Sequence, residues 1–131
     1  MHLSGMSGNG AVYWWCLKFH SNTMHAESDW KKFRAMVPKL RERYLGKCNA
    51  RIAALLTDPA KNETECFWDA METMEKEAKL LRHCLDGHSR SKMWLFIISM
   101  IRSGMLDQGD LTEFSAELRD SVSRAFDEIA R

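Results

Sequence analysis

Apolar side chains return at steps of three and four residues from Trp30 to Leu55. The series is Trp30, Phe33, Val37, Leu40, Tyr44, Cys48, Ile52 and Leu55. This spacing places them on one stripe of an α-helix. Ser28 is a suitable N-cap, and Asp29 suits the first turn. Pro38 interrupts the stripe without changing its phase, which favours one long kinked helix over two separate helices.

The same spacing predicts three more helices. The second follows Asn62, which has Glu65 at capping-box distance, and its expected buried row is Phe67, Ala70, Met71, Met74, Ala78, Leu81 and Leu85. The third opens at Ser89, closes before Gly104, and is apolar all round in its middle, so we expect it to be buried. The fourth begins at Asp110 and buries Leu111, Phe114, Leu118, Val122, Ala125 and Ile129. Short connections between four helices predict an all-α, four-helix antiparallel bundle.

The N-terminal 28 residues have a different character. Residues 1–9 are small and polar, and residues 11–19 are apolar and aromatic. We expect residues 1–28 to form an apolar arm, with its degree of order left open, and residues 29–131 to form the helical domain. A signal peptide is disfavoured because no basic region precedes the apolar run. A start of translation at Met24 is an alternative.

Composition limits the functional classes. A net charge of +1 argues against a globally basic nucleic-acid or membrane binder. No run approaches the roughly 18–20 apolar residues that span a bilayer. The four cysteines form no C-x-x-C pair, so we expect free thiols in a reducing compartment and a cytoplasmic location.

The segment "RHCLDGHSRS" resembles a metal or nucleophile site at first sight. His83 and Cys84 are adjacent on a helix, so their side chains diverge by about 100° and converge poorly on one ion. Cys84 also lies at a helix C-terminus, where the dipole raises a thiol pKa. We therefore interpret the segment as a hinge, with Gly87 making the turn and Ser89 capping the next helix.

Other candidates for chemistry are weak as well. Asp107 and Asp110 lack the further oxygen ligands of a calcium loop and are interpreted as turn and cap residues. Arg51 lies near the apolar row, and we expect it to pair with an acid from another helix. We predict no metal, no cofactor and no catalytic residue, so an enzyme is the less favoured class.

Charge is segregated between helices. Residues 31–51 contain eight basic residues and one acid, whereas the second and fourth helices are acidic. Within the basic segment, Lys32, Lys39, Arg43 and Lys47 fall in one sector opposite the apolar row. This basic stripe could bind phosphates, which makes nucleic-acid binding the alternative function. A solvated face is the simpler interpretation.

Trp68 lies about 100° away from the predicted buried row of its helix, close to Glu72 and Glu75. It either covers the N-terminal arm or is exposed, and exposed tryptophans are enriched at interfaces. We expect a small soluble interaction or regulatory protein, with Trp68, Glu72 and Glu75 contacting a protein partner or a second copy in a homodimer. We expect no membrane association.

Overall fold

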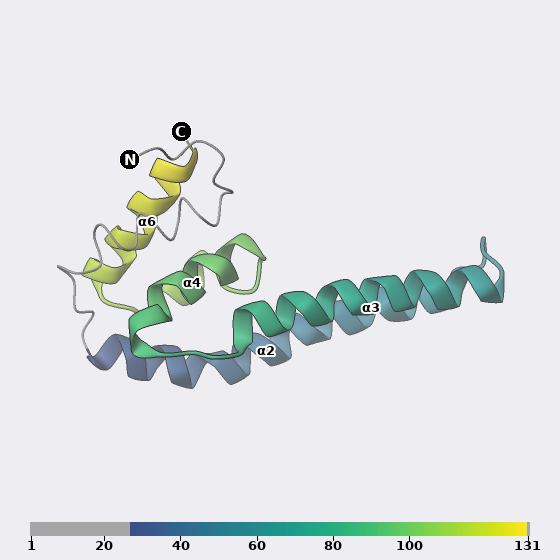
Figure 1. Ribbon diagram of the computed structural model, residues 1–131, viewed down its shortest axis with the longest axis horizontal. Coiled ribbons are helices and arrows are strands. Elements are labelled where there is room, and N and C mark those ends of the chain that lie inside the picture. The colour runs from purple at the N-terminus through teal and green to yellow at the C-terminus, as the bar shows by residue number, and fades with distance from the viewer. Residues whose placement is uncertain (1–26, 131) are drawn as a thin grey trace. The chain divides into compact units, whose positions relative to one another are not determined.

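The computed structural model describes residues 27–130, and these are all-helical, with five α-helices, one 3₁₀ helix and no strand. The helices are α2 (Glu27–Leu56), α3 (Glu63–Leu85), η1 (Arg90–Lys92), α4 (Met93–Arg102), α5 (Gln108–Leu111) and α6 (Ala116–Ala130) (Figure 1). The predicted all-α class is confirmed for this part of the chain. The predicted N-terminal arm lies, except for its last two residues, outside the described residues.

The chain divides into two compact units. Met36–Gly87 make up the first, which we call the hairpin unit. The second, which we call the C-terminal unit, combines the chain up to Ala35 with residues from His88 onward. Helix α2 contributes to both units. The joining of all the helices in a single antiparallel bundle stays a prediction.

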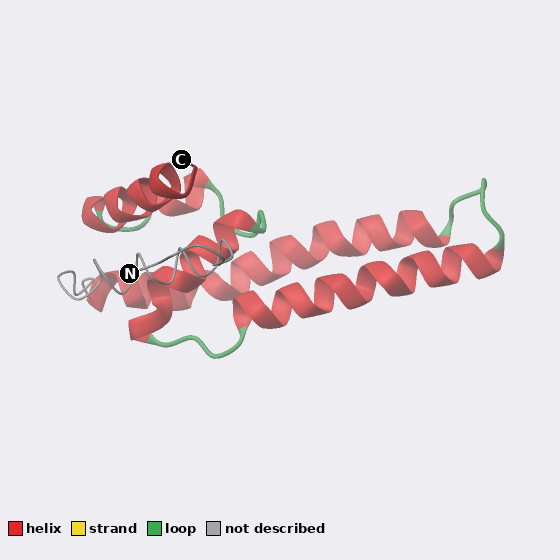
Figure 2. Ribbon diagram, turned by 45° about the horizontal axis from the view of Figure 1, so that its top comes forward, coloured by secondary structure: helices red, strands yellow, loops and turns green. Residues whose placement is uncertain are grey.

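The hairpin unit contains two antiparallel helices, the second part of α2 and the whole of α3 (Figure 2). α2 continues through Pro38, as the unbroken phase of its apolar stripe predicted; the predicted kink stays a prediction. The buried apolar side chains of this unit are Met36, Val37, Leu40, Cys48 and Ile52 from α2 and Cys66, Ala70 and Cys84 from α3. The buried side chains of α3 are thus all small, two cysteines and one alanine.

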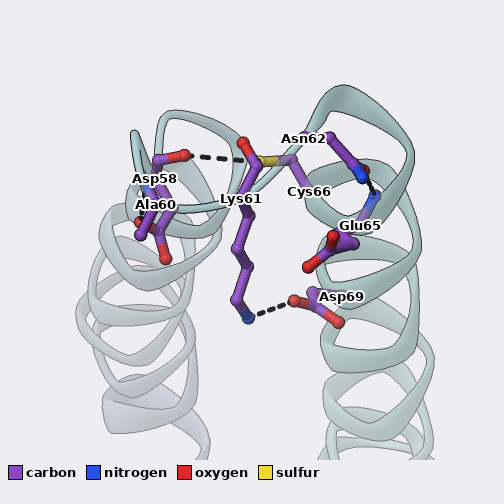
Figure 3. Close-up of polar contacts among 7 residues, drawn as sticks. All are labelled: Asp58, Ala60, Lys61, Asn62, Glu65, Cys66 and Asp69. Carbon is purple, nitrogen blue, oxygen red and sulfur yellow. Dashed lines mark hydrogen bonds and ion pairs between the residues drawn. The ribbon is translucent and has the colours of Figure 1, made fainter.

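The turn between these helices is fixed by side chains at both ends, as Figure 3 shows. The Asn62 side chain accepts a hydrogen bond from the Glu65 amide at 2.8 Å and so caps α3, at the position the sequence predicted. Asp58 accepts from the Ala60 amide at 3.0 Å, and Lys61 forms an ion pair with Asp69. Leu56 at the end of α2 is thereby held near the first turn of α3.

α4 forms the centre of the C-terminal unit. Met93, Trp94, Ile97, Ile98 and Met100 are buried, and no residue from Met93 to Ile101 is exposed. The expectation that the third predicted helix is buried is confirmed. The Trp94 indole N–H donates to Ser121 Oγ of α6 at 3.0 Å, which satisfies the one polar atom of this large buried side chain.

The fourth predicted helix is wrong at its start, because α5 and α6 are separate. The helical hydrogen bonding is interrupted at Ser115, because its amide donates to the Asp29 carboxylate at 2.8 Å instead of to a carbonyl one turn earlier. Its hydroxyl accepts from the Leu118 amide at 3.2 Å and caps α6. The predicted burial of Leu111, Phe114, Leu118, Val122 and Ala125 is confirmed. The side chain of Ile129 lies outside the described part.

Asp107 and Asp110 are cap residues, as predicted. Each carboxylate accepts a hydrogen bond from the other residue's amide, at 2.9 Å in both directions, which makes a capping box at the start of α5. Among residues 27–130, no helix combines the length and apolar character needed to cross a bilayer.

Candidate interaction surface

α3 presents an apolar stripe that does not face α2. Phe67, Met71, Met74 and Ala78 follow one another at steps of four, three and four residues. They lie about 100° around the helix from the row that packs on α2, which contains Cys66, Ala70 and Cys84. Phe67 is 51% exposed and Met74 50%, and Met71 and Ala78 are partly exposed. We call Phe67, Met71, Met74 and Ala78 the α3 stripe.

The predicted buried row of the second helix is therefore wrong in phase. Of its seven residues only Ala70 is buried; Phe67 and Met74 are exposed, and Met71, Ala78, Leu81 and Leu85 are partly exposed. The physical reason is that α3 turns a row of small and sulfur-containing side chains toward α2, and its largest apolar side chains point past α2. The helix itself was predicted correctly.

Leu56 extends this apolar surface onto the end of α2. Its side chain is 48% exposed. Leu56, Phe67 and Trp68 line the same open pocket of about 450 Å³, together with Glu63, Thr64 and Cys66. Because Leu56 and Phe67 line one pocket, the face of α2 that carries Leu56 and the face of α3 that carries Phe67 lie on the same side of the hairpin.

Two further apolar residues lie on that side of α2. Leu45, Ile52 and Leu56 are separated by steps of seven and four residues, which places them on one side of the helix. Leu45 is partly exposed, and Ile52 is buried at the boundary with α3. Asn49 falls between them and is exposed, so the α2 row is apolar with one polar position. We call the α3 stripe together with Leu45, Ile52 and Leu56 the apolar face.

Trp68 borders the apolar face and is 60% exposed. Its ring contacts Phe67 edge-on, with centroids 5.0 Å apart and planes at 89°. Glu72 and Glu75 are also exposed, and Glu72 forms an i,i+4 ion pair with Lys76 at 3.1 Å. The structure thus places the three predicted partner-binding residues along one edge of α3. Contact between Trp68 and the N-terminal arm, one of the two alternatives from the sequence, stays a prediction.

A polar cluster fixes the register of the two hairpin helices. Glu77 accepts hydrogen bonds from the Tyr44 hydroxyl at 2.6 Å and from Arg51 Nη2 at 2.8 Å, and the Cys48 thiol lies 3.4 Å from the same carboxylate. The expected pairing of Arg51 with an acid from another helix is confirmed. The Arg51 side chain is 55% exposed, however, so it lies at the edge of the hairpin and not in its interior.

This cluster is inert as a nucleophile site. Burial, and then the hydrogen bond to Glu77, raise the pKa of the Cys48 thiol above its ordinary value of 9.0, so the thiol is protonated near neutral pH. The same two causes raise the pKa of Tyr44. The charge of Glu77 is the largest cause that raises the pKa of Arg51, which stays cationic. The arrangement links the helices and generates no reactive group.

The basic stripe is solvent-facing, as predicted. Lys39, Arg43 and Lys47 are exposed on the part of α2 that belongs to the hairpin unit, and Lys32 is exposed on the part that belongs to the C-terminal unit. At about 100° per residue, Lys47 lies on the opposite side of α2 from the row that ends at Leu56. The basic residues and the apolar face therefore use different sides of the hairpin.

The "RHCLDGHSRS" segment is a turn at Gly87, as interpreted from the sequence. The expected cap at Ser89 is wrong, because the Ser89 side chain makes no capping hydrogen bond to η1. Gly87 has a positive φ of 76°, and the Asp86 amide donates to the Arg82 carbonyl at the end of α3. His88 packs edge-on against Phe33 and Phe96, at centroid distances of 5.0 and 4.4 Å. Within residues 27–130, no three His, Cys, Asp or Glu side chains are grouped so as to hold a metal ion.

Comparisons with protein-family models, with curated proteins and with solved structures find no match to this chain.

Proposed function

We propose that this chain is a small helical interaction protein that binds another protein chain through the apolar face of its hairpin unit. One observation supports the proposal above all: the large apolar side chains that are exposed on the described residues, Leu56, Phe67, Trp68 and Met74, all belong to the hairpin unit. Single exposed apolar residues are common on protein surfaces, but a contiguous group marks an interaction site.

The chemistry of the face suggests how it would bind. Phe67 and Met74 provide an aromatic and methionine-containing centre, and Trp68 borders it; these are residue types enriched in interface cores. Glu72 and Glu75 lie beside it and are exposed, which is typical of a polar rim. Rim charges contribute more to partner choice and association rate than to affinity. The expected partner surface is therefore apolar, with basic groups at its edge.

Site-specific photocrosslinking tests the proposal. A benzophenone derivative of phenylalanine in place of Phe67 is close in shape to the native residue and faces the proposed partner. We expect irradiation in cells to give a covalent adduct with a protein chain. The matched control places the same group at Lys76, which is exposed on the opposite side of α3. Equal yields at both positions, or no adduct at either, would count against the proposal.

Nucleic-acid binding is a second candidate, favoured by the exposure of Lys32, Lys39, Arg43 and Lys47 along one helix. Binding through phosphates releases counterions, so the affinity for DNA or RNA should fall steeply as salt increases. We expect the double substitution K39E/R43E to abolish this binding in a fluorescence anisotropy titration, while K76E/R124E, which changes charge equally elsewhere, preserves it. Absence of binding to both nucleic acids at low salt would exclude this function.

Two further expectations from the sequence belong to this proposal. One is the antiparallel four-helix bundle as the arrangement of the whole chain, and the other is a cytoplasmic location. The residues of the proposed binding face all lie in the α2–α3 hairpin.

A further inference from the structure

The α3 stripe has the spacing of a coiled-coil seam. Phe67, Met71, Met74 and Ala78 alternate steps of four and three, and Leu81 and Leu85 continue the same series. This alternation places apolar residues at a and d positions of the heptad, where one helix packs against another. α2 does not fill this role, because it packs on the row of Cys66, Ala70 and Cys84. The seam therefore has no helix against it within the hairpin.

The neighbouring row on α2 makes the surface two helices wide. Leu45, Ile52 and Leu56 run antiparallel to the α3 stripe on the same side of the hairpin, and the polar Asn49 lies within their row. A single polar residue in an otherwise apolar seam lowers stability but restricts the registers in which helices can pair. A two-helix layer with one apolar side reaches a complete core when a second two-helix layer covers it, as in a four-helix bundle.

The charges beside the seam show an order that is self-complementary. Along the edge of α3 that carries Trp68, the acids Glu72 and Glu75 come first, and the basic residues Lys79 and Arg82 follow; all four are exposed. Two copies of α3 aligned in parallel bring like charges together. An antiparallel alignment about a twofold axis brings the acidic half of each helix toward the basic half of the other.

We infer that the occupant of the apolar face is the hairpin of a second copy of this chain, docked antiparallel to form an intermolecular four-helix bundle. This inference rests on the proposed function, and it names the partner. The heptad spacing provides the apolar seam, and the acidic-then-basic order along α3 provides the orientation.

Charge exchange tests the pairing in solution. Sedimentation equilibrium of the full chain should show a dimer. The variants E72K/E75K and K79E/R82E should each be weakened in self-association by at least about tenfold, because each makes the whole edge one sign. A mixture of the two variants should recover a dimer, because a basic edge then meets an acidic one. All four positions are exposed, so the fold should persist, and circular dichroism checks this.

The crosslink from position 67 tests the orientation. In the antiparallel pair, the benzophenone group in place of Phe67 should attach to the later part of the partner's α3, from position 78 onward. Attachment within positions 63–71 of the partner would overturn the antiparallel arrangement. The variant M74E places a charge in the seam. It should abolish both the dimer and the adduct.

The outcomes separate the two proposals. A monomer at all concentrations, together with an adduct to a different protein, overturns self-pairing and leaves the proposed function intact. A monomer with no adduct overturns both. A dimer that survives M74E and both charge variants, with the fold unchanged, also overturns the inference, because its interface then lies elsewhere.

Discussion

At the scale of single residues, Asp29 is the clearest structural feature that the sequence did not indicate. Its carboxylate is 1% exposed and accepts hydrogen bonds from the Ser115 amide at 2.8 Å and the Ser115 hydroxyl at 2.7 Å. It also lies at the N-terminus of α6, where a negative charge is favourable. Spacing along the chain identifies local contacts only, so a partner 86 residues away could not be predicted.

Replacing Asp29 with Asn should destabilise the protein by about 1–3 kcal/mol, the usual cost of disturbing a buried hydrogen-bonded group. The amide has one acceptor oxygen where the carboxylate has two, so one of the two Ser115 donors loses its partner. Urea denaturation followed by circular dichroism measures the free energy of unfolding. Asp120→Asn, the same change at an exposed position of α6, should alter it by less than about 0.5 kcal/mol. Equal losses in the two variants would contradict the role assigned to Asp29.

Tyr44 and Cys48 make the hairpin sensitive to alkali. Both groups have folded-state pKa values above their ordinary values of 10.0 and 9.0, mainly because of burial and then because of the bond to Glu77. The folded state therefore binds these protons more tightly than the unfolded state does. The stabilisation that these two protonated groups give the folded state is fully present below about pH 9. It is lost as the pH rises from there toward the folded-state pKa values.

The variant Tyr44→Phe tests this dependence. It removes the 2.6 Å hydrogen bond to Glu77 and should lower the free energy of unfolding by about 1.5 kcal/mol near neutral pH. Between about pH 8 and about pH 10.5 the native chain should lose more stability than the variant, since the variant lacks one of the two titrating groups. Parallel pH profiles would show that the pKa of Tyr44 does not differ between the folded and unfolded states.

At the scale of elements, the sequence predicted helices better than it predicted the faces they bury. The apolar spacing located α2, α3 and α4, and Asn62 and Gly87 marked the ends of α3 correctly. The buried side of α3 was misassigned because apolar spacing selects the most hydrophobic side, whereas packing on α2 uses Cys66, Ala70 and Cys84. Glu77 also lies on that packed side, which is possible only because Tyr44 and Arg51 satisfy its carboxylate.

The exposure of the α3 stripe can be tested by one substitution at Met74 of α3, with the same substitution at Met36 of α2 as a buried reference. Met36 is 5% exposed and Met74 is 50% exposed, and both belong to the hairpin unit. Met36→Ala should cost about 2–5 kcal/mol, the range for truncating a buried methionine. Met74→Ala should cost less than about 1 kcal/mol when measured at concentrations where the chain is monomeric. A reversed order would restore the buried row expected from the sequence.

The candidate site was predicted in part for the same reason. The sequence shows that Trp68 is displaced from the apolar row and that Glu72 and Glu75 lie beside it, so these three residues could be predicted as partner-binding residues. The sequence predicts Phe67 and Met74 to be in the core, and the structure instead exposes both at the apolar centre of the surface. The four-three alternation that places them on a seam is present in the sequence, but without the position of α2 it describes a core and an interface equally well.

At the scale of the whole molecule, three buried thiols are concentrated in one unit. Cys48, Cys66 and Cys84 all lie in the hairpin unit and are at most 3% exposed. A buried thiol reacts slowly with alkylating reagents, so modification requires the hairpin to open.

We expect iodoacetamide to modify these three cysteines slowly in the native protein and rapidly in urea. Peptide mass spectrometry after timed quenching gives the rate at each site. Leu40→Ala, which removes a buried side chain between the two helices, should increase the rate at all three sites, whereas Lys76→Ala at the exposed surface should not. Fast modification of the native chain would contradict the burial of these thiols.

The contrast between Trp68 and Trp94 gives the protein its own optical probe. The Trp94 indole is buried and donates a hydrogen bond to Ser121, so we expect its emission to be insensitive to events at the surface. Trp68 is 60% exposed, so we expect water to red-shift its emission and iodide to quench it. A chain that binds over Phe67 and Met74 also excludes water from the neighbouring Trp68 ring. In a variant that carries phenylalanine in place of Trp14, Trp15 and Trp30, binding at the hairpin can therefore be followed without a label, as a blue shift of the emission and as loss of quenching by iodide.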